Sequence, residues 1–324
     1  MYKCVYFFLV PSSDNPDLKS GPKFKSRNIK YDFFGKNEIG IVKRIKMLPN
    51  YAAHFYVFES AESVKIAEVG TSCYELQTVN FIRDDHNMLL RYKDEKLYFL
   101  HGFLRSLSCS RKYIYLLCNF YSRLLNSIHL LVGSNIIHNN IGFKTIVVNS
   151  FEIPILTNFR FSLDLNKENV SESLKHIFIQ YNPGYTFWPP EIHLLCYIYT
   201  NKLSSLSNFN VETVLKDIGL QGDTNIVNHF SKYVNKNCDI IVADILRYSN
   251  TWDQYALGIC YIKMIEDLQK NIKTSNNFVV MFLDLLRTTV SYTMRPSVSE
   301  TIAKYQQLLD SCDVNDLYML VKRI

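Results

Sequence analysis

The chain has 324 residues, of which 48% are hydrophobic and 20% are charged, and its formal net charge is +6. This composition excludes a disordered, collagen-like or low-complexity chain, since those need fewer apolar residues, more net charge, or far more glycine and proline. The weak basic excess, without a clustered stripe of Lys and Arg, does not favour a dedicated nucleic-acid-binding protein. No stretch reaches the roughly 20 uninterrupted apolar residues of a membrane span.

The first third of the chain mixes strand-like and helical patterns. Residues 2–10 predict a strand rather than a signal peptide, because the apolar run is short. Residues 11–30, with their prolines, serines and densest lysines, predict a solvated loop. Residues 38–47 repeat apolar side chains at helical spacing. Three runs rich in aromatic and β-branched residues predict short strands: 54–58, 63–68 and 87–92.

From residue 97 onward the pattern is mainly helical. Residues 112–131 predict a long buried helix. Two very short β-type runs follow, at 146–148 and 153–156. A Ser297-x-x-Glu300 capping box marks the start of the last helix. Further helices are predicted near 190–200, 211–218, 224–234, 238–248, 252–270, 278–290 and 297–310.

The eight cysteines show neither a Cys-x-x-Cys pair nor the spacing of a zinc site. Several lie in apolar runs, as in Leu-Leu-Cys at 116–118 and 194–196, and are typical of small core residues. Unpaired cysteines of this kind are typical of a reducing compartment, so we expect a cytosolic or nuclear protein.

The order of these elements, together with the residues at 137–148, resembles a protein kinase. His138-Asn139-Asn140-Ile141 and the residues to Thr145 resemble the catalytic loop H-R-D-L-x-x-x-N, which is followed by a short strand. Asn158-Phe159-Arg160, 20 residues after His138, resembles the D-F-G segment. The degenerate loop is similar to that of the divergent kinase-like proteins of large DNA viruses.

Other segments extend the resemblance over nearly the whole chain. Trp188-Pro189-Pro190-Glu191 resembles the A-P-E motif, and Asp253-Gln254-Tyr255 begins a match to the start of the central buried helix. Met294-Arg295-Pro296 resembles the arginine segment near the end of the fold. Residues 88–92 resemble the strand that enters the hinge, and Glu38 resembles the glutamate of the αC helix.

The resemblance implies that the catalytic groups are lost. Asn140 stands where an aspartate accepts the substrate proton, and an amide cannot act as that base. Gly142 replaces the loop lysine, Thr145 replaces the metal-binding asparagine, and Asn158 replaces the aspartate that binds Mg²⁺. Arg160 replaces the D-F-G glycine and adds bulk and charge.

The phosphate-binding elements are also missing from the pattern. No G-x-G-x-x-G occurs, and the chain is expected to begin at the second or third strand of the N-lobe. Residues 5–8, which look like the strand of the V-A-I-K motif, have no lysine in register. We therefore expect no ATP or Mg²⁺ cofactor and no other metal.

The resemblance implies that the structural groups are kept. His138 would be a packing and hydrogen-bonding centre, and Phe159 would pack between the lobes. Glu191 and Arg295 would form a buried ion pair, and Asp253 would hold the catalytic-loop backbone. Tyr and Phe residues at 183–188 are expected to pack rather than to form a ligand cage. Random substitution would not remove the catalytic residues while it keeps the structural ones.

The chain departs from the kinase pattern between Glu191 and Asp253, which are 62 positions apart, much further than a kinase needs. Residues 197–248 predict at least two extra helices, placed where kinases present a peptide-docking surface. This insertion would either cover that surface or offer a new one.

The sequence therefore predicts a protein-kinase-like bilobal α+β fold. A truncated strand-rich N-lobe would span 1–95, and a helical C-lobe would span 96–324 with the insertion. The expected function is that of a pseudokinase that binds protein partners as a scaffold in the cytoplasm of an infected cell, without specific nucleic acid, membrane or small-molecule substrate. Two alternatives stay open: an atypical active serine/threonine kinase that uses Asp164 or Glu152, and a structural virion component.

Overall fold

In the computed structural model of the protein, the structure describes residues 24–64, 87–107, 111–167, 170–269, 277–292 and 294–312. Within these ranges the fold is of the mixed α and β class, with small sheets and a predominance of helix. The strand predicted over residues 2–10 lies outside the described residues, and so does the second half of the strand predicted at 63–68.

The elements follow the predicted order closely. The strands are β1 (Phe24–Lys30), β2 (Phe55–Tyr56), β3 (Ser60–Val64), β4 (Asn87–Lys93), β5 (Tyr98–Phe99), β6 (Ile136–Ile137), β7 (Ile146–Val148), β8 (Pro154–Thr157) and β9 (Leu163–Asp164). The α-helices are α1 (Phe33–Ile45), α2 (Leu100–Ser106), α3 (Arg111–Gly133), α4 (Val170–Ile177), α5 (Pro190–Thr200), α6 (Asn208–Asp217), α7 (Thr224–Ser231), α8 (Cys238–Leu246), α9 (Trp252–Gln269), α10 (Asn277–Thr289) and α11 (Val298–Ser311).

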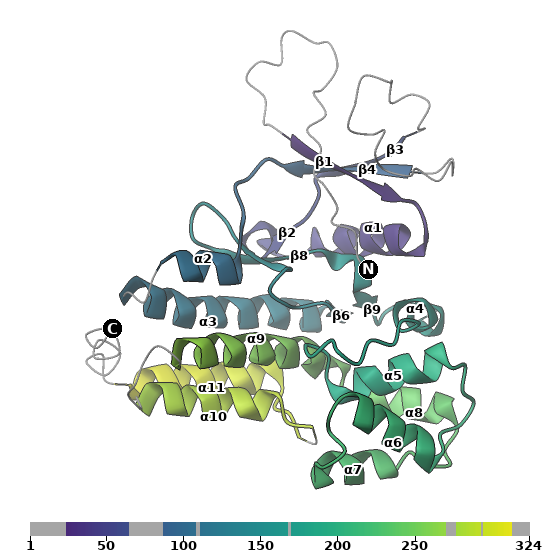
Figure 1. The fold of residues 1–324 in the computed structure, drawn as a ribbon. Coiled ribbons are helices and arrows are strands. Elements are labelled where there is room, and N and C mark those ends of the chain that lie inside the picture. The colour runs from purple at the N-terminus through teal and green to yellow at the C-terminus, as the bar shows by residue number, and fades with distance from the viewer. Residues whose placement is uncertain are drawn as a thin grey trace.

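A three-stranded antiparallel sheet, in the order β1-β4-β3, lies above α1 (Figure 1). The prediction of a loop through residue 30 is wrong, because β1 pairs with β4 along its whole length, from Phe24 opposite Lys93 to Lys30 opposite Asn87. The β1 sequence is polar and buries mainly Ser26 and Ile29, so the strand depends on its partner rather than on its own pattern.

The predicted pair of short runs forms an antiparallel hairpin of β7 and β8. The Asn149 side chain accepts hydrogen bonds from the N–H groups of Phe151 and Ile153, both at 3.0 Å, and so closes the turn. This hairpin is the centre of a four-stranded sheet in the order β2-β8-β7-β5. Because β6 pairs with β9 in a separate two-stranded sheet, the loop between β6 and β7 is fixed at both ends.

Two apolar cores support these elements. The larger core joins α1 and the strands to α3, α9, α10 and α11. At its centre the ring of Tyr121 meets those of Tyr261, Phe282 and Tyr305 edge to face, with centroids 4.7 to 5.1 Å apart. The capping box predicted at the start of α11 forms between Ser297 and Glu300.

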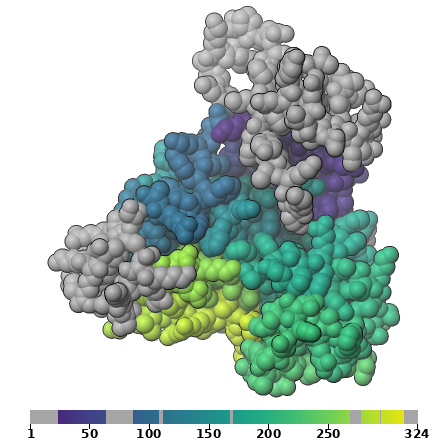
Figure 2. Space-filling view, viewed as in Figure 1, coloured from purple at the N-terminus to yellow at the C-terminus, as the bar shows by residue number. Residues whose placement is uncertain are grey.

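The second core unites α4 to α8 with Trp252 at the start of α9. Residues 197–248 contain α6, α7 and α8, and Figure 2 shows this green region as a continuous mass at the lower right. Residues 197–248 are therefore a packed part of the fold. No helix within the described residues is long and apolar enough to span a membrane.

Candidate functional site

Asp253, in the first turn of α9, holds the loop after β6 by its backbone. Its two carboxylate oxygens accept hydrogen bonds from the N–H groups of His138, at 2.6 Å, and Asn139, at 2.8 Å. Burial raises the pKa of Asp253 to about 7, while these two donors favour the ionised carboxylate. The predicted contact between Asp253 and the loop backbone is therefore present.

His138 connects this loop to β8. Its Nδ1 accepts the Asn140 N–H at 3.3 Å, so the ring proton lies on Nε2, which donates to the Thr157 carbonyl at 3.1 Å. Burial lowers the pKa of His138 to about 4 and keeps the imidazole neutral. The ring also packs against Phe159, with centroids 4.7 Å apart. With both nitrogens engaged, His138 acts as a structural link and not as a free base.

Asn140 and Thr145 bond to groups of the chain itself. The Asn140 Oδ1 accepts a hydrogen bond from the Tyr185 hydroxyl at 3.2 Å. The Thr145 hydroxyl donates to the Asn140 carbonyl at 2.7 Å and accepts the Gly142 N–H at 2.9 Å. Since Thr145 is buried, its hydroxyl closes the loop from inside and is not directed to a ligand.

Aromatic side chains of residues 185–188 cover this loop. The Trp188 indole N–H donates to the Asn139 carbonyl at 3.0 Å. A Cβ built at Gly142 would lie 3.4 Å from the Tyr185 hydroxyl and 3.6 Å from the Phe187 ring, which is ordinary van der Waals contact. The prediction that these aromatic residues pack is confirmed. The sequence did not indicate that they pack on the loop 139–142.

The segment after β8 is tied to α1. Phe159 is buried and meets Phe55 with ring centroids 5.8 Å apart. Asn158 has a positive φ of 68°, which asparagine tolerates better than most residues. The Arg160 guanidinium lies 3.7 Å from Asp32 and over the Phe34 ring. The positive charge of Arg160 is thus held by the start of α1.

Arg27 of β1 and Glu38 of α1 form a buried ion pair, and their side chains are 13% and 3% exposed. The Arg27 guanidinium also lies 5.7 Å from the centre of the Tyr92 ring. The strand directly before α1 is β1, and it carries a cation that faces Glu38. The strand without a lysine was predicted at residues 5–8, which lie outside the described residues. The cation that faces Glu38 comes instead from β1, where the sequence predicted a loop because polar residues hide the alternation of the strand.

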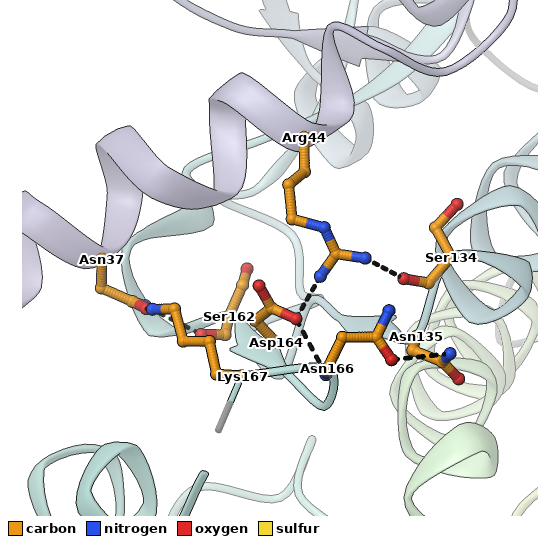
Figure 3. A network of polar contacts seen from close by, with 8 residues as sticks. All are labelled: Asn37, Arg44, Ser134, Asn135, Ser162, Asp164, Asn166 and Lys167. Carbon is orange, nitrogen blue, oxygen red and sulfur yellow. Dashed lines mark hydrogen bonds and ion pairs between the residues drawn. The ribbon is translucent and has the colours of Figure 1, made fainter. Parts of the chain in front are cut away.

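A polar network joins α1 to the chain around β9 (Figure 3). Arg44 forms an ion pair with Asp164 and donates to the Ser134 carbonyl at 2.5 Å. The Asp164 carboxylate also accepts the Asn166 N–H at 3.0 Å. Nothing in the sequence pattern indicated this network, because its partners are about 120 positions apart.

Asn37 adds a second connection in the same network (Figure 3). Its amide N–H donates to the Ser162 carbonyl at 2.8 Å, and its oxygen accepts from the Lys167 ammonium at 3.2 Å. Asn37 is buried, so these bonds satisfy both ends of its amide group. They fix the distance between α1 and the segment that follows Asn158.

The connector between β4 and β5 has its own contacts. The Tyr56 hydroxyl donates to the Lys93 carbonyl at 2.6 Å, and the Lys25 ammonium donates to the Glu95 carbonyl at 3.0 Å. Lys25 also pairs with Asp94 at 2.6 Å. The carbonyls of Lys93 and Glu95 are therefore both hydrogen-bonded to side chains of the protein.

The ion pair predicted between Glu191 and Arg295 is present, and both side chains are less than 10% exposed. Arg295 also donates to the Thr251 hydroxyl at 2.8 Å and to the Ser291 carbonyl at 3.2 Å. Burial lowers the pKa of Arg295 only to about 10, so the guanidinium stays charged at neutral pH. The pair joins α5 to the segment before α11.

Among the described residues, no group of three or more His, Cys, Asp or Glu side chains is arranged to hold a metal ion. Comparisons with known proteins show no family, since no protein-family model and no curated protein matches the chain. The candidate site therefore consists of the loop 138–145, the segment 158–160 and the aromatic residues that cover the loop.

Proposed function

We propose that this chain is a catalytically inactive protein-kinase-like protein that binds protein partners as a scaffold. The arrangement of a small sheet with α1, a connector, and a larger helical part supports this proposal (Figure 1). The hairpin of β7 and β8, placed between the loop 138–145 and the segment 158–160, supports it as well.

The observation that carries the proposal is the difference between two sets of residues. Asp253 and the pair of Glu191 with Arg295 make the buried contacts that the kinase resemblance implies. Asn140 stands at the position of the proton acceptor, and its amide oxygen already accepts a hydrogen bond from the Tyr185 hydroxyl. Phosphoryl transfer needs a base, metal ligands and charge to stabilise the transferred group. The structural set is thus present while the chemical set is replaced.

The residues present do not fit ATP with Mg²⁺. Thr145 and Asn158 stand at the metal-ligand positions, and both are neutral groups that bind a hard cation poorly. The Thr145 hydroxyl is engaged inside the loop. Arg27 of β1 pairs with Glu38 of α1 and lies 5.7 Å from the centre of the Tyr92 ring. The sequence contains no G-x-G-x-x-G segment to cover the phosphates.

The alternative of an active enzyme with relocated acids has little support. Asp164 is buried, and its Oδ1 both pairs with Arg44 and accepts the Asn166 N–H, so the carboxylate has a structural role. Glu152 lies on the turn between β7 and β8 and pairs with Lys112 of α3. Both carboxylates have structural partners, and moving either to the loop would break an ion pair.

A scaffold function is supported by contacts that hold the parts of the fold without a ligand. The pairs of Arg44 with Asp164 and of Asn37 with Ser162 fix α1 against the segment after β8. Many enzymes close loops or domains around their substrate in each cycle. A fixed arrangement is instead suited to presenting a constant surface, and the insertion at 197–248 adds a large part of that surface.

A phosphotransfer assay tests the proposal. The purified chain would be incubated with radiolabelled ATP and either Mg²⁺ or Mn²⁺, alone and with generic protein substrates. We expect incorporation no higher than for the variant Asn140→Ala, which lacks the amide side chain. Turnover on the kinase scale of about 1–100 per second, abolished by Asn140→Ala, would overturn the proposal.

A further inference from the structure

The Tyr185 hydroxyl occupies a chemically specific place. It donates a hydrogen bond to the side-chain oxygen of Asn140, at 3.2 Å. A substrate hydroxyl would make the same donation to a proton-accepting residue at the start of phosphoryl transfer. In this chain the Tyr185 hydroxyl therefore makes, at the loop that resembles a catalytic loop, the hydrogen bond that a substrate hydroxyl would make.

This hydroxyl is held in place by several contacts of the neighbouring residues. The Trp188 indole N–H bonds to the Asn139 carbonyl at 3.0 Å. The Lys263 ammonium of α9 donates to the Thr186 hydroxyl at 2.6 Å and lies 4.6 Å from the centre of the Phe187 ring. The segment is thus attached to the loop on one side and to α9 on the other.

The same segment fills the space beside the loop. Gly142 is buried, and the nearest atoms to a Cβ at this position belong to Tyr185 and Phe187. Phe187 also meets the Phe143 ring edge to face, with centroids 5.5 Å apart. The Tyr185 hydroxyl already bonds to the Asn140 side-chain oxygen, so an external peptide hydroxyl would have to compete with it for that acceptor.

We propose that residues 185–188 form an internal plug, in which the Tyr185 phenol takes the place of an acceptor hydroxyl at Asn140. This inference rests on the proposed function, because the kinase-like loop gives that place its meaning. The consequence is specific: the loop is closed to peptide substrates, and a protein partner binds to a surface other than this one.

Amide hydrogen exchange, followed by mass spectrometry of peptides that cover 138–145, measures the closure without nucleotide. Tyr185→Phe removes one hydrogen bond and should speed exchange about twofold to twelvefold. Tyr185→Ala removes the ring as well and should speed it at least tenfold. The matched control is Tyr181→Phe, which removes a phenol hydrogen bond to Asp217 at 3.0 Å on α6 and should leave these peptides unchanged.

A chemical rescue separates the hydroxyl from the ring. Added to Tyr185→Ala at equal millimolar concentrations, p-cresol should restore protection of 138–145 several-fold better than toluene, which lacks the hydroxyl. Exchange within twofold of the wild type in both Tyr185 variants would overturn the plug. Equal acceleration by Tyr181→Phe, or toluene equal to p-cresol, would overturn it too.

These outcomes are independent of the test of catalysis. If the chain transferred phosphate but Tyr185→Phe still loosened the loop, the inactive assignment would fail and the plug would stand as an inhibitory contact. If no transfer occurred and the Tyr185 variants left exchange unchanged, the plug alone would fail.

Discussion

The buried ion pair between Glu191 and Arg295 gives a sharp stability prediction. Arg295→Ala removes the guanidinium that binds Glu191, the Thr251 hydroxyl and the Ser291 carbonyl. The remaining Glu191 carboxylate, only 8% exposed, would lose its charged partner. Removing one member of a buried pair costs about 3–5 kcal/mol of unfolding free energy, and we expect a loss in this range.

Urea unfolding followed by far-UV circular dichroism measures this loss. The matched control is Arg287→Ala, since Arg287 pairs with Asp284 at 2.8 Å but both side chains are more than 60% exposed. An exposed pair contributes about 0–1 kcal/mol, so the control should change little. The double variant Arg295→Ala with Glu191→Gln should recover about 1–2 kcal/mol, because no unpaired charge remains buried.

A different pattern would refute the reasoning. If Arg295→Ala cost no more than Arg287→Ala, the pair would not be a structural requirement of the fold. If the double variant were less stable than the wild type by the sum of the losses of the two single variants, the two residues would act independently. The role assigned to the pair would then be withdrawn.

Three further results are expected. Asn140→Ala should cost less than about 1.5 kcal/mol, the scale of its single side-chain hydrogen bond, and a loss equal to that of Arg295→Ala would show that the loop residue is structural. Burial lowers the pKa of His138 to about 4, so its stabilisation is full above about pH 6.5 and is lost as pH falls. The unfolding free energy of the wild type should therefore fall faster than that of His138→Gln between pH 6.5 and 4.5, by about 1.4 kcal/mol per unit; equal slopes would contradict this. Asn140→Asp with Asn158→Asp should stay at background phosphorylation, because neither change supplies the G-x-G-x-x-G segment that covers the phosphates and that the sequence lacks, and turnover would reveal an intact nucleotide site.

Much of the helical part could be predicted from the sequence, because its elements carry local signals. The apolar spacing at 112–131 predicted α3, and the capping box at Ser297 marked the start of α11. The hairpin at 146–156 was visible because two β-branched runs flank a turn. Such signals depend on neighbours within a few positions, so they survive in a single sequence.

β1 shows where local signals fail. Its seven residues are mostly polar, and its strand conformation depends on pairing with β4 about 60 positions away. Missing this strand meant missing the ion pair of Arg27 with Glu38. The sequence of β4 carries a strand pattern of its own, but the pairing of β1 with it is decided by tertiary contacts, which leave no such pattern in β1.

The site was predicted only where a motif fixed both partners. Asp253 with the loop backbone and Glu191 with Arg295 followed from the order of motifs. The contact of Tyr185 with Asn140 could not be predicted, because the two residues are 45 positions apart and no local pattern shows that the chain brings them together. The bonds of Lys25 to the connector depend on β1 and were missed for the same reason.

The central claim, a kinase-like fold without ATP chemistry, is tested most directly by thermal unfolding with and without ATP and Mg²⁺. A ligand at about 100 times its Kd adds roughly 2.7 kcal/mol to the stability of the folded state, which a melting scan detects. We predict no change in Tm at millimolar ATP, with or without Mg²⁺, and none in the variant Arg27→Ala beyond its own loss of stability. A Mg²⁺-dependent rise in the Tm of the wild type that disappears in Arg27→Ala would contradict the account.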